Sequence, residues 1–149
     1  MRRGLTLIEI VITIALIVVI TGIYIVAANP AGQLASSRNT QRSLHLQTIG
    51  NSVRANMADQ GNEKFLCSSG PIPTTSTLMG SAAGQYNIAP CLIPTYIFSM
   101  PFDPIASSAH YVSVSDYATG YAISINASGT VITLSAPSAE LGKTISITR

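Results

Sequence analysis

Charged residues are scarce in this sequence. They make up 9% of its 149 residues, whereas a soluble domain averages about 25%. The formal net charge is +2, from eight Lys and Arg against six Asp and Glu, so there is no basic surface of the kind that predicts nucleic-acid binding. The length suits one domain with a modest core. So few charges to keep copies of the chain apart are typical of a protein in an assembly or at a membrane.

Sequence patterns for catalysis and for cofactor binding are also missing. The two histidines, His45 and His110, lie at no zinc-motif spacing from the two cysteines, Cys67 and Cys91. The glycine-bearing stretch 80–84 lacks the lysine of a phosphate-binding loop. Six carboxylates, one of them inside an apolar run, are a poor basis for paired acid/base chemistry. The sequence therefore predicts a protein that is not an enzyme and needs no cofactor.

One long apolar run, by contrast, is present at the N-terminal end. The run extends from Leu5 to Ala28, and its last 19 residues carry no charge. As a helix, residues 5–28 would be about 36 Å long, enough to cross a bilayer core. Arg2 and Arg3 precede the run, so the N-terminus is expected to stay in the cytoplasm.

Three interpretations of this run are open. It is a secretory signal peptide cut after residues 26–28, a plain signal anchor, or a segment cut on the cytoplasmic side after Gly4. Glu9 favours the third, because a carboxylate in a membrane helix costs about 2.5–3.5 kcal/mol near the centre and needs a partner. If Leu5 became the new N-terminus, its free amine on a neighbouring copy could pair with Glu9, and most of that gain would offset desolvation.

The residues around this cleavage point resemble a known signature. Gly4-Leu5-Thr6-Leu7-Ile8-Glu9, ahead of a long apolar run, is similar to the prepilin signature of type IV pilins and type II secretion pseudopilins, with leucine where phenylalanine is usual. The resemblance implies that a membrane aspartic peptidase, the prepilin peptidase, cuts after Gly4 and N-methylates Leu5. It makes Glu9 the assembly glutamate and residues 1–4 the leader peptide.

The same resemblance implies a location and partners. The precursor would be a single-pass protein of the bacterial inner membrane, with residues 5–28 as the transmembrane and assembly helix and the head outside. It would then join an extracellular or periplasmic homo-oligomeric filament through an inner-membrane assembly platform. The alternative is a minor tip pilin that acts as an adhesion or DNA-capture module. The neutral, small-residue loop 68–89 argues against DNA capture, which favours Lys, Arg and aromatic residues.

After the apolar run the sequence predicts a kink and then an amphipathic helix, together residues 29–58. The kink is expected at residues 29–32, because Pro30 disfavours helical geometry in itself and in the residue before it. An apolar stripe at helical spacing predicts the face that packs on a sheet; its members are Leu46, Ile49, Val53 and Met57. Arg38 and Arg42, one turn apart, predict a positive patch on a polar surface, and His45 is expected on the polar part of the helix. Residues 59–62 are expected to end the helix.

The head, residues 59–149, divides into a loop region, 59–104, and a strand region, 105–149. Six of the eight prolines fall between residues 65 and 104, with a helical turn expected at 92–99. A loop this long needs restraint. A disulfide between Cys67 and Cys91 would supply it and stabilise an exported chain by roughly 3 kcal/mol, the alternative being two unrelated buried thiols.

Period-two alternation in the strand region predicts the sheet. The candidate strands are residues 111–114, 121–126, 130–134 and 144–148, with a hairpin turn at 127–129. The predicted fold class is therefore α+β: a long kinked N-terminal helix packed on a small antiparallel sheet of three or four strands. A roll of this kind is similar to the pilin fold.

Two aspartates are weak candidates for calcium ligands. The segment Met100-Pro101-Phe102-Asp103-Pro104 and the tyrosines that follow resemble a pattern of major pseudopilins, some of which bind calcium in this region. Asp103 and Asp116 would be the ligands here, although calcium takes six to eight oxygens. The other role for an aspartate before proline, as in Asp103, is turn formation.

Overall fold

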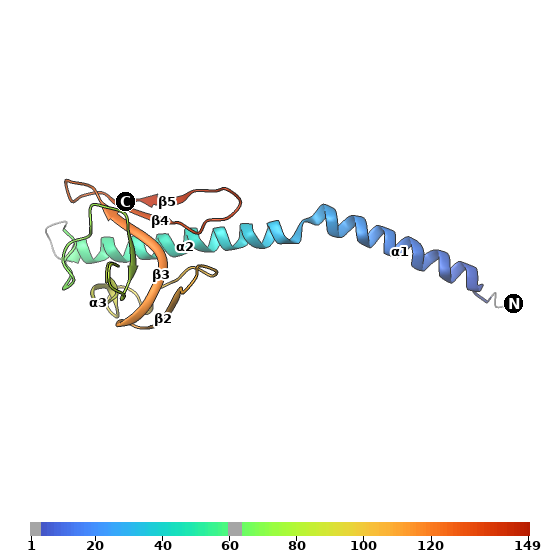
Figure 1. The fold of residues 1–149 in the computed structure, drawn as a ribbon, viewed down its shortest axis with the longest axis horizontal. Helices are drawn as coiled ribbons and strands as arrows, with labels where there is room; N and C mark the ends of the chain where they lie inside the picture. The colour runs from blue at the N-terminus through green and yellow to red at the C-terminus, as the bar shows by residue number, and fades with distance from the viewer. Residues whose placement is uncertain (1–3, 60–63) are drawn as a thin grey trace. The chain divides into compact units, whose positions relative to one another are not determined.

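The computed structural model describes residues 4–59 and 64–149. The predicted leader residues 1–3 and the predicted helix end at residues 60–62 lie outside these ranges. The chain forms two compact units, Met1–Ala35 and Ser36–Arg149, which are described separately below (Figure 1).

The first unit contains helix α1, Leu7–Ala28, and the first turns of helix α2, Pro30–Asp59. Thr6 caps α1, because its hydroxyl accepts a hydrogen bond from the backbone N–H of Glu9. In lipid, a single segment satisfies its own backbone hydrogen bonds only as a helix. The prediction of an apolar helix at the N-terminal end is confirmed.

The predicted kink is confirmed, and it is confined to one residue. Asn29 separates α1 from α2 and adopts a left-handed conformation, with φ of 40°. Pro30 explains the break, since it has no N–H to donate and excludes helical angles from the residue before it. The Asn29 side chain then accepts a hydrogen bond from the N–H of Gly32 at 3.2 Å. A Cβ at Gly32 would lie 2.8 Å from the amide nitrogen of that side chain, so a larger residue there would displace the Asn29 cap.

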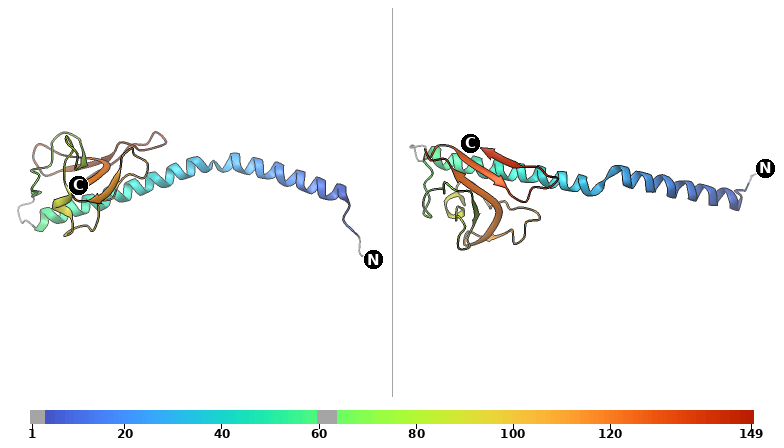
Figure 2. Two further views of the ribbon diagram at one scale, coloured as in Figure 1. Left: turned by 60° about the horizontal axis from the view of Figure 1, so that its bottom comes forward. Right: turned by 45° about the horizontal axis from the view of Figure 1, so that its top comes forward.

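The second unit is built on the apolar face of α2. The four residues of the predicted stripe, Leu46, Ile49, Val53 and Met57, are all buried in the core. They pack with residues from the sheet, among them Tyr121, Ile123 and Leu134. The views in Figure 2 agree that the sheet lies against this part of α2. The prediction that the stripe covers the sheet is confirmed.

The sheet has five antiparallel strands, one more than the upper limit of the prediction. The strands are β1 Thr77–Gly80, β2 His110–Ser113, β3 Asp116–Ile125, β4 Ile132–Ala136 and β5 Ile145–Thr148. Their order is β1-β3-β4-β5, with β2 also paired to β3. Ala122 pairs with both β1 and β4, and Ala118 pairs with both β1 and β2. It follows that β2 and β4 occupy the same edge of β3, one after the other.

The β3–β4 hairpin forms as predicted. Its turn is held by Asn126, whose side-chain oxygen accepts hydrogen bonds from the N–H groups of Thr130 and Val131. Gly129 has φ of 74°, a conformation that favours glycine. At the far edge, β5 pairs with β4, and its residues Ile145 and Ile147 pack against the core.

The predicted loop region, residues 59–104, also contains a strand that the sequence did not predict, β1. The short helix α3, Ala89–Leu92, meets the start of the helical turn predicted at 92–99. β1 is only four residues long and is specified by its pairing with β3, which no local pattern reveals. β3 begins at Asp116, whereas the prediction began at Tyr121. The prediction missed the first half of this strand because Ala118 and Gly120 are weak strand formers.

We expect Ile49→Ala to destabilise the second unit by about 2–5 kcal/mol, because it removes buried methyl groups and leaves a cavity. Gln47→Ala, on the exposed side of the same helix, should change stability by less than about 0.5 kcal/mol. Unfolding of the full chain in detergent, followed by circular dichroism, measures both. Equal effects of the two substitutions would contradict the assignment of the core face.

Candidate assembly helix and the charge cluster of the head

Helix α1 exposes almost its whole apolar surface. None of its residues is buried, and its large apolar side chains, from Leu7 to Val26, are 47–82% exposed. Soluble monomers rarely expose apolar patches of more than a few hundred Å². Within the described residues this is one helix, near the N-terminus, that is long and apolar enough to cross a membrane. A signal sequence meets the same criteria, so α1 is a candidate membrane span or signal sequence.

The polar groups of α1 are few and mostly satisfied within the helix. The hydroxyls of Thr13 and Thr21 each donate to a backbone carbonyl of the preceding turn, at 2.8 Å. Such bonds remove the cost of placing a hydroxyl in an apolar environment. Glu9, in the first turn, is different. In the described part of the chain no ion pair involves its carboxylate, although the helix N-terminus favours a negative charge there.

The head contains a buried charge cluster around Arg42. The Arg42 side chain is 0% exposed and binds Asp103 with two nitrogens, at 2.7 and 3.1 Å. A third nitrogen donates to Glu140 at 2.8 Å and to the side-chain oxygen of Asn39 at 2.8 Å. Because every one of these donors meets an acceptor, the cost of burying the guanidinium is offset.

Arg38, Asn39 and Glu140 complete the cluster. Arg38 forms a second two-nitrogen ion pair with the Glu140 carboxylate, at 2.6 and 2.8 Å. The Asn39 amide donates to the Glu140 carbonyl and accepts from the Glu140 N–H, at 2.8 and 3.0 Å. The cluster therefore contains two positive and two negative charges. It joins α2 both to the loop before β2 and to the loop between β4 and β5.

The predicted positive patch at Arg38 and Arg42 is therefore wrong. Arg42 lies four residues before Leu46, so helical spacing extends the buried face of α2 to it. The acidic partners of the two arginines lie 61 to 102 residues away in the sequence, and sequence reasoning also missed Glu140 and Asn39. The partners of a buried charge have no local signature, because only the tertiary fold defines them.

The cluster shifts the titration of its carboxyl groups. Burial raises the pKa of Asp103, but hydrogen bonds from Arg42 and from the N–H groups of Ile105 and Ala106 outweigh burial, so that the pKa lies below its ordinary value. Hydrogen bonds from Arg38 and then from Arg42 lower the pKa of Glu140 from 4.5 to about 2. Both carboxylates are therefore charged at neutral pH.

The two calcium candidates have separate partners. Both oxygens of Asp103 accept hydrogen bonds from Arg42, and one also accepts the N–H groups of Ile105 and Ala106. Asp103 thus forms a turn, which is the other role expected of an aspartate before proline. Asp116 is exposed on β3 and contacts His110 at 3.0 Å. Within residues 4–59 and 64–149 no group of three His, Cys, Asp or Glu is placed to hold a metal ion.

His45 is half-buried, which corrects its predicted place on the polar part of α2. Its Nδ1 lies 2.8 Å from the hydroxyl of Tyr121, and the two rings meet edge to face. Burial lowers the pKa of His45. The pKa of His110 is raised instead, by hydrogen bonds to the Ser108 carbonyl and to Asp116. The two histidines are separate structural residues, and each has a different partner.

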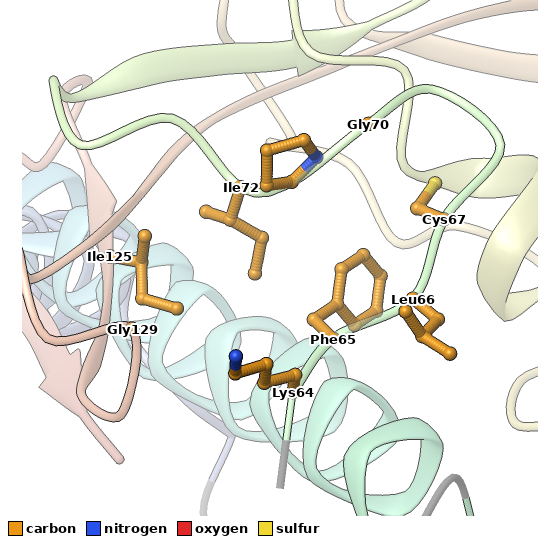
Figure 3. Close-up of a pocket in the computed structure, with 9 residues that line it drawn as sticks. Lys64, Phe65, Leu66, Cys67, Gly70, Ile72, Ile125 and Gly129 are labelled. Atoms are coloured by element: carbon orange, nitrogen blue, oxygen red, sulfur yellow. The ribbon is translucent and has the colours of Figure 1, made fainter. Parts of the chain in front are cut away.

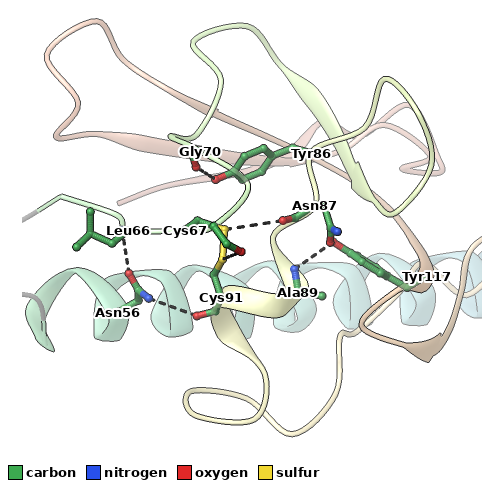
Figure 4. Close-up of a disulfide and its surroundings, with 10 residues drawn as sticks. Asn56, Leu66, Cys67, Gly70, Tyr86, Asn87, Ala89, Cys91 and Tyr117 are labelled. Carbon is green, nitrogen blue, oxygen red and sulfur yellow. Dashed lines mark hydrogen bonds between the residues drawn. A yellow bond between two sulfur atoms is a disulfide. The ribbon is translucent and has the colours of Figure 1, made fainter.

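The predicted disulfide between Cys67 and Cys91 is present (Figure 4). Asn56 of α2 ties both arms of the bridge to the helix: it accepts the N–H of Leu66 and donates to the Cys91 carbonyl. Tyr117 of β3 accepts the N–H of Ala89, two residues before Cys91. The bridge therefore fastens the proline-rich region to both layers of the core.

A cavity of about 360 Å³ lies next to this bridge (Figure 3). Among the described residues its lining is largely apolar, with one charged side chain, that of Lys64. Lys64 directly follows residues 60–63, which lie outside the described ranges. We assign the cavity no ligand.

No family model, no curated protein and no solved structure matches this chain.

We expect Arg42→Met to destabilise the head by about 3–5 kcal/mol, because it leaves the Asp103 carboxylate buried without its partner. Arg54→Met, at an exposed position of the same helix, should cost less than about 0.5 kcal/mol. Arg42→Lys should also destabilise, since an ammonium cannot reproduce the two-nitrogen contact. Thermal unfolding of the full chain in detergent provides the comparison. A wild-type melting curve for Arg42→Met would refute the role of the cluster.

The stability of the head should fall in acid through Glu140. Its pKa is lower in the folded state than in the unfolded state, so its contribution is fully present above pH 4.5 and is lost as the pH falls through about 2. In Glu140→Gln this part of the pH dependence should disappear. Arg38→Met should weaken it, because the hydrogen bond from Arg38 is the largest cause of the shift. The measurement is the melting temperature of the wild type and of both variants from pH 5 to pH 2. A pH dependence equal to that of the wild type in both variants would contradict the role of Glu140.

Proposed function

We propose that this protein is a structural subunit of a type IV pilus or of a type II secretion pseudopilus. One observation carries the proposal: α1 is a 22-residue apolar helix without cover from the described chain, and it contains a carboxylate at Glu9. The motif Gly4-Leu5-Thr6-Leu7-Ile8-Glu9, which resembles the prepilin signature, starts immediately before this helix.

The proposed mechanism starts in the membrane. The precursor is held in the bacterial inner membrane by α1, with its N-terminus in the cytoplasm and its head on the other side. The prepilin peptidase hydrolyses the bond after Gly4, and the new amine of Leu5 is N-methylated. At the assembly platform, Glu9 of the incoming subunit pairs with the Leu5 amine of a subunit already in the filament.

The energetics of α1 support this mechanism. Transfer from lipid into a bundle of other α1 helices replaces one apolar environment with another, so it brings no hydrophobic gain. A carboxylate in that environment is costly when alone and favourable when it meets a cation. The ion pair between Glu9 and the amine therefore favours entry into the filament and sets the position of each subunit along its neighbour.

Two features of the head support a location outside the cytoplasm. Disulfides persist in oxidising compartments, and the Cys67–Cys91 bridge restrains a region that has little regular structure. The ion pairs of Arg42 then tie two loops to α2. Both restraints stabilise the fold that a subunit of an extracellular or periplasmic filament must keep. The proposal gives the head a structural role and no catalytic one.

The test combines a mass measurement with substitutions at Glu9. We expect the mature subunit to begin at a methylated Leu5, and Glu9→Ala to be cut at the same bond but to be absent from filaments. Glu9→Asp should recover part of the filament yield, because it keeps the charge. Thr13→Ala, one turn further along α1 and uncharged, is the matched control and should assemble normally.

Intact mass spectrometry of membrane-purified protein reports the cleavage, and the yield of sheared filaments reports assembly. A mature N-terminus at Asn29 would establish a secretory signal peptide and end the proposal. An uncleaved chain would establish a signal anchor. Normal filaments from Glu9→Ala would exclude the pairing with the Leu5 amine.

A further inference from the structure

The N-terminal end of α1 is defined by Thr6. Residues 4–6 are not helical, and the helix begins at Leu7. Thr6 is extended, with φ of −81° and ψ of 150°, and its hydroxyl oxygen accepts the N–H of Glu9 at 3.4 Å. Its carbonyl oxygen accepts the N–H groups of Glu9 and Ile10, at 3.1 and 3.3 Å. Thr6 therefore caps α1 with both its backbone and its side chain.

Without this cap, the helix would be expected to start earlier. Leu5 is apolar like the residues of α1 and is a good helix former. Extension of the helix toward the N-terminus would move its unpaired N–H groups out of the lipid, toward water that can satisfy them. The Thr6 hydroxyl satisfies one of these N–H groups where it stands, at Glu9. The side chain of Thr6 thus opposes extension of the helix.

The bond assigned to the prepilin peptidase joins Gly4 to Leu5, immediately before the capping residue. Both residues are exposed. Hydrolysis adds water across this amide and leaves a carboxyl group on Gly4 and an amine on Leu5. A peptide bond inside a helix has its N–H and C=O groups paired with other backbone groups, whereas an extended chain offers them to a binding partner. The extended backbone before Thr6 is therefore a conformation that suits cleavage.

We propose that Thr6 is a positioning residue for this cleavage: by starting α1 at Leu7, it keeps the Gly4–Leu5 bond in an extended, accessible chain. This inference rests on the proposed function and adds a residue to it. Thr6 acts through its own chain, because its side chain binds the N–H of Glu9. A contact between the threonine and the peptidase is not needed.

The cap and the charge of Glu9 can be separated by substitution. Thr6 and Glu9 have the spacing of a capping box, in which the glutamate side chain would accept the N–H of the threonine in return. Among the hydrogen bonds of residues 4–59 and 64–149, the contact between the two is the one from the Glu9 backbone to Thr6. A change at Thr6 therefore removes the cap and leaves the Glu9 carboxylate in place.

The first measurement locates the start of α1. Backbone carbon chemical shifts of the uncleaved full chain in detergent micelles report which residues are helical. Thr6→Val keeps the shape of threonine without its acceptor and should move the start of the helix to residue 5 or earlier. Thr6→Ser and Thr6→Asn keep an acceptor and should leave the start at Leu7. A helix that still begins at Leu7 in Thr6→Val would overturn the inference.

The second measurement is the rate of cleavage in membranes that contain the prepilin peptidase. Thr6→Val should be cut about fivefold more slowly than the wild type, the factor that corresponds to one lost cap of about 1 kcal/mol. Thr6→Ser and Thr6→Asn should be cut at close to the wild-type rate. Thr13→Val is the matched control, because the Thr13 hydroxyl donates to the Ile10 carbonyl within the helix and caps no end. It should also be cut at the wild-type rate.

The outcomes separate this inference from the proposed function. Cleavage of the wild type and of Thr6→Val at the same rate would refute the role of Thr6 and leave the filament proposal standing. Equally slow cleavage of Thr6→Ser, Thr6→Asn and Thr6→Val would show that the peptidase reads threonine itself, which also refutes it. A wild-type chain that is not cut after Gly4 would overturn the two proposals together.

Discussion

One constraint stands out in this molecule: helix α1 has an apolar surface that none of the described residues covers. A folded protein normally buries such a surface against its own core. Here the buried cluster lies in the second unit, and among the described residues it contains none from α1. In the proposed function this cover comes first from lipid and then from other copies of α1.

The head has few charges and a large share of irregular structure, so its stability depends on a small core and on individual restraints. Its core is formed by one face of α2, by the sheet and by residues of the proline-rich region such as Ile72, Ile88 and Leu92, and of these the helix face and the sheet were expected from periodicity. Outside that core the chain relies on point restraints. The disulfide holds the proline-rich region, the Arg42 pairs hold two loops, and the side chains of Asn56 and Asn126 satisfy backbone groups that no strand or helix satisfies.

The elements with strong periodicity could be predicted from the sequence. The apolar run, the stripe from Leu46 to Met57 and the alternation from Tyr121 to Ile125 each follow a repeat that one packing mode explains. The kink followed from the geometry of Pro30. The pairing of the two cysteines followed from their number, once export was assumed.

The missing parts share a different physical origin. Strand β1 exists because β3 offers it hydrogen bonds, and the sequence from Thr77 to Gly80 has no pattern of its own. Arg42 is buried because two carboxylates distant in sequence converge on it. Interactions of this kind depend on the tertiary fold, so a reading of local patterns assigns such residues to loops or to the surface. The part of the candidate site on α1 was visible in the sequence, and the part in the head was not.

The position of the disulfide also has a mechanical consequence. The bridge joins residues 24 apart and encloses β1 within the closed ring. A force pulling on the chain from α2 and from the C-terminus passes through the sulfur atoms and bypasses that ring. About 80 Å of contour length therefore cannot be drawn out of the head under tension. Strand β1 thus lies in a stretch of the chain that pulling cannot straighten.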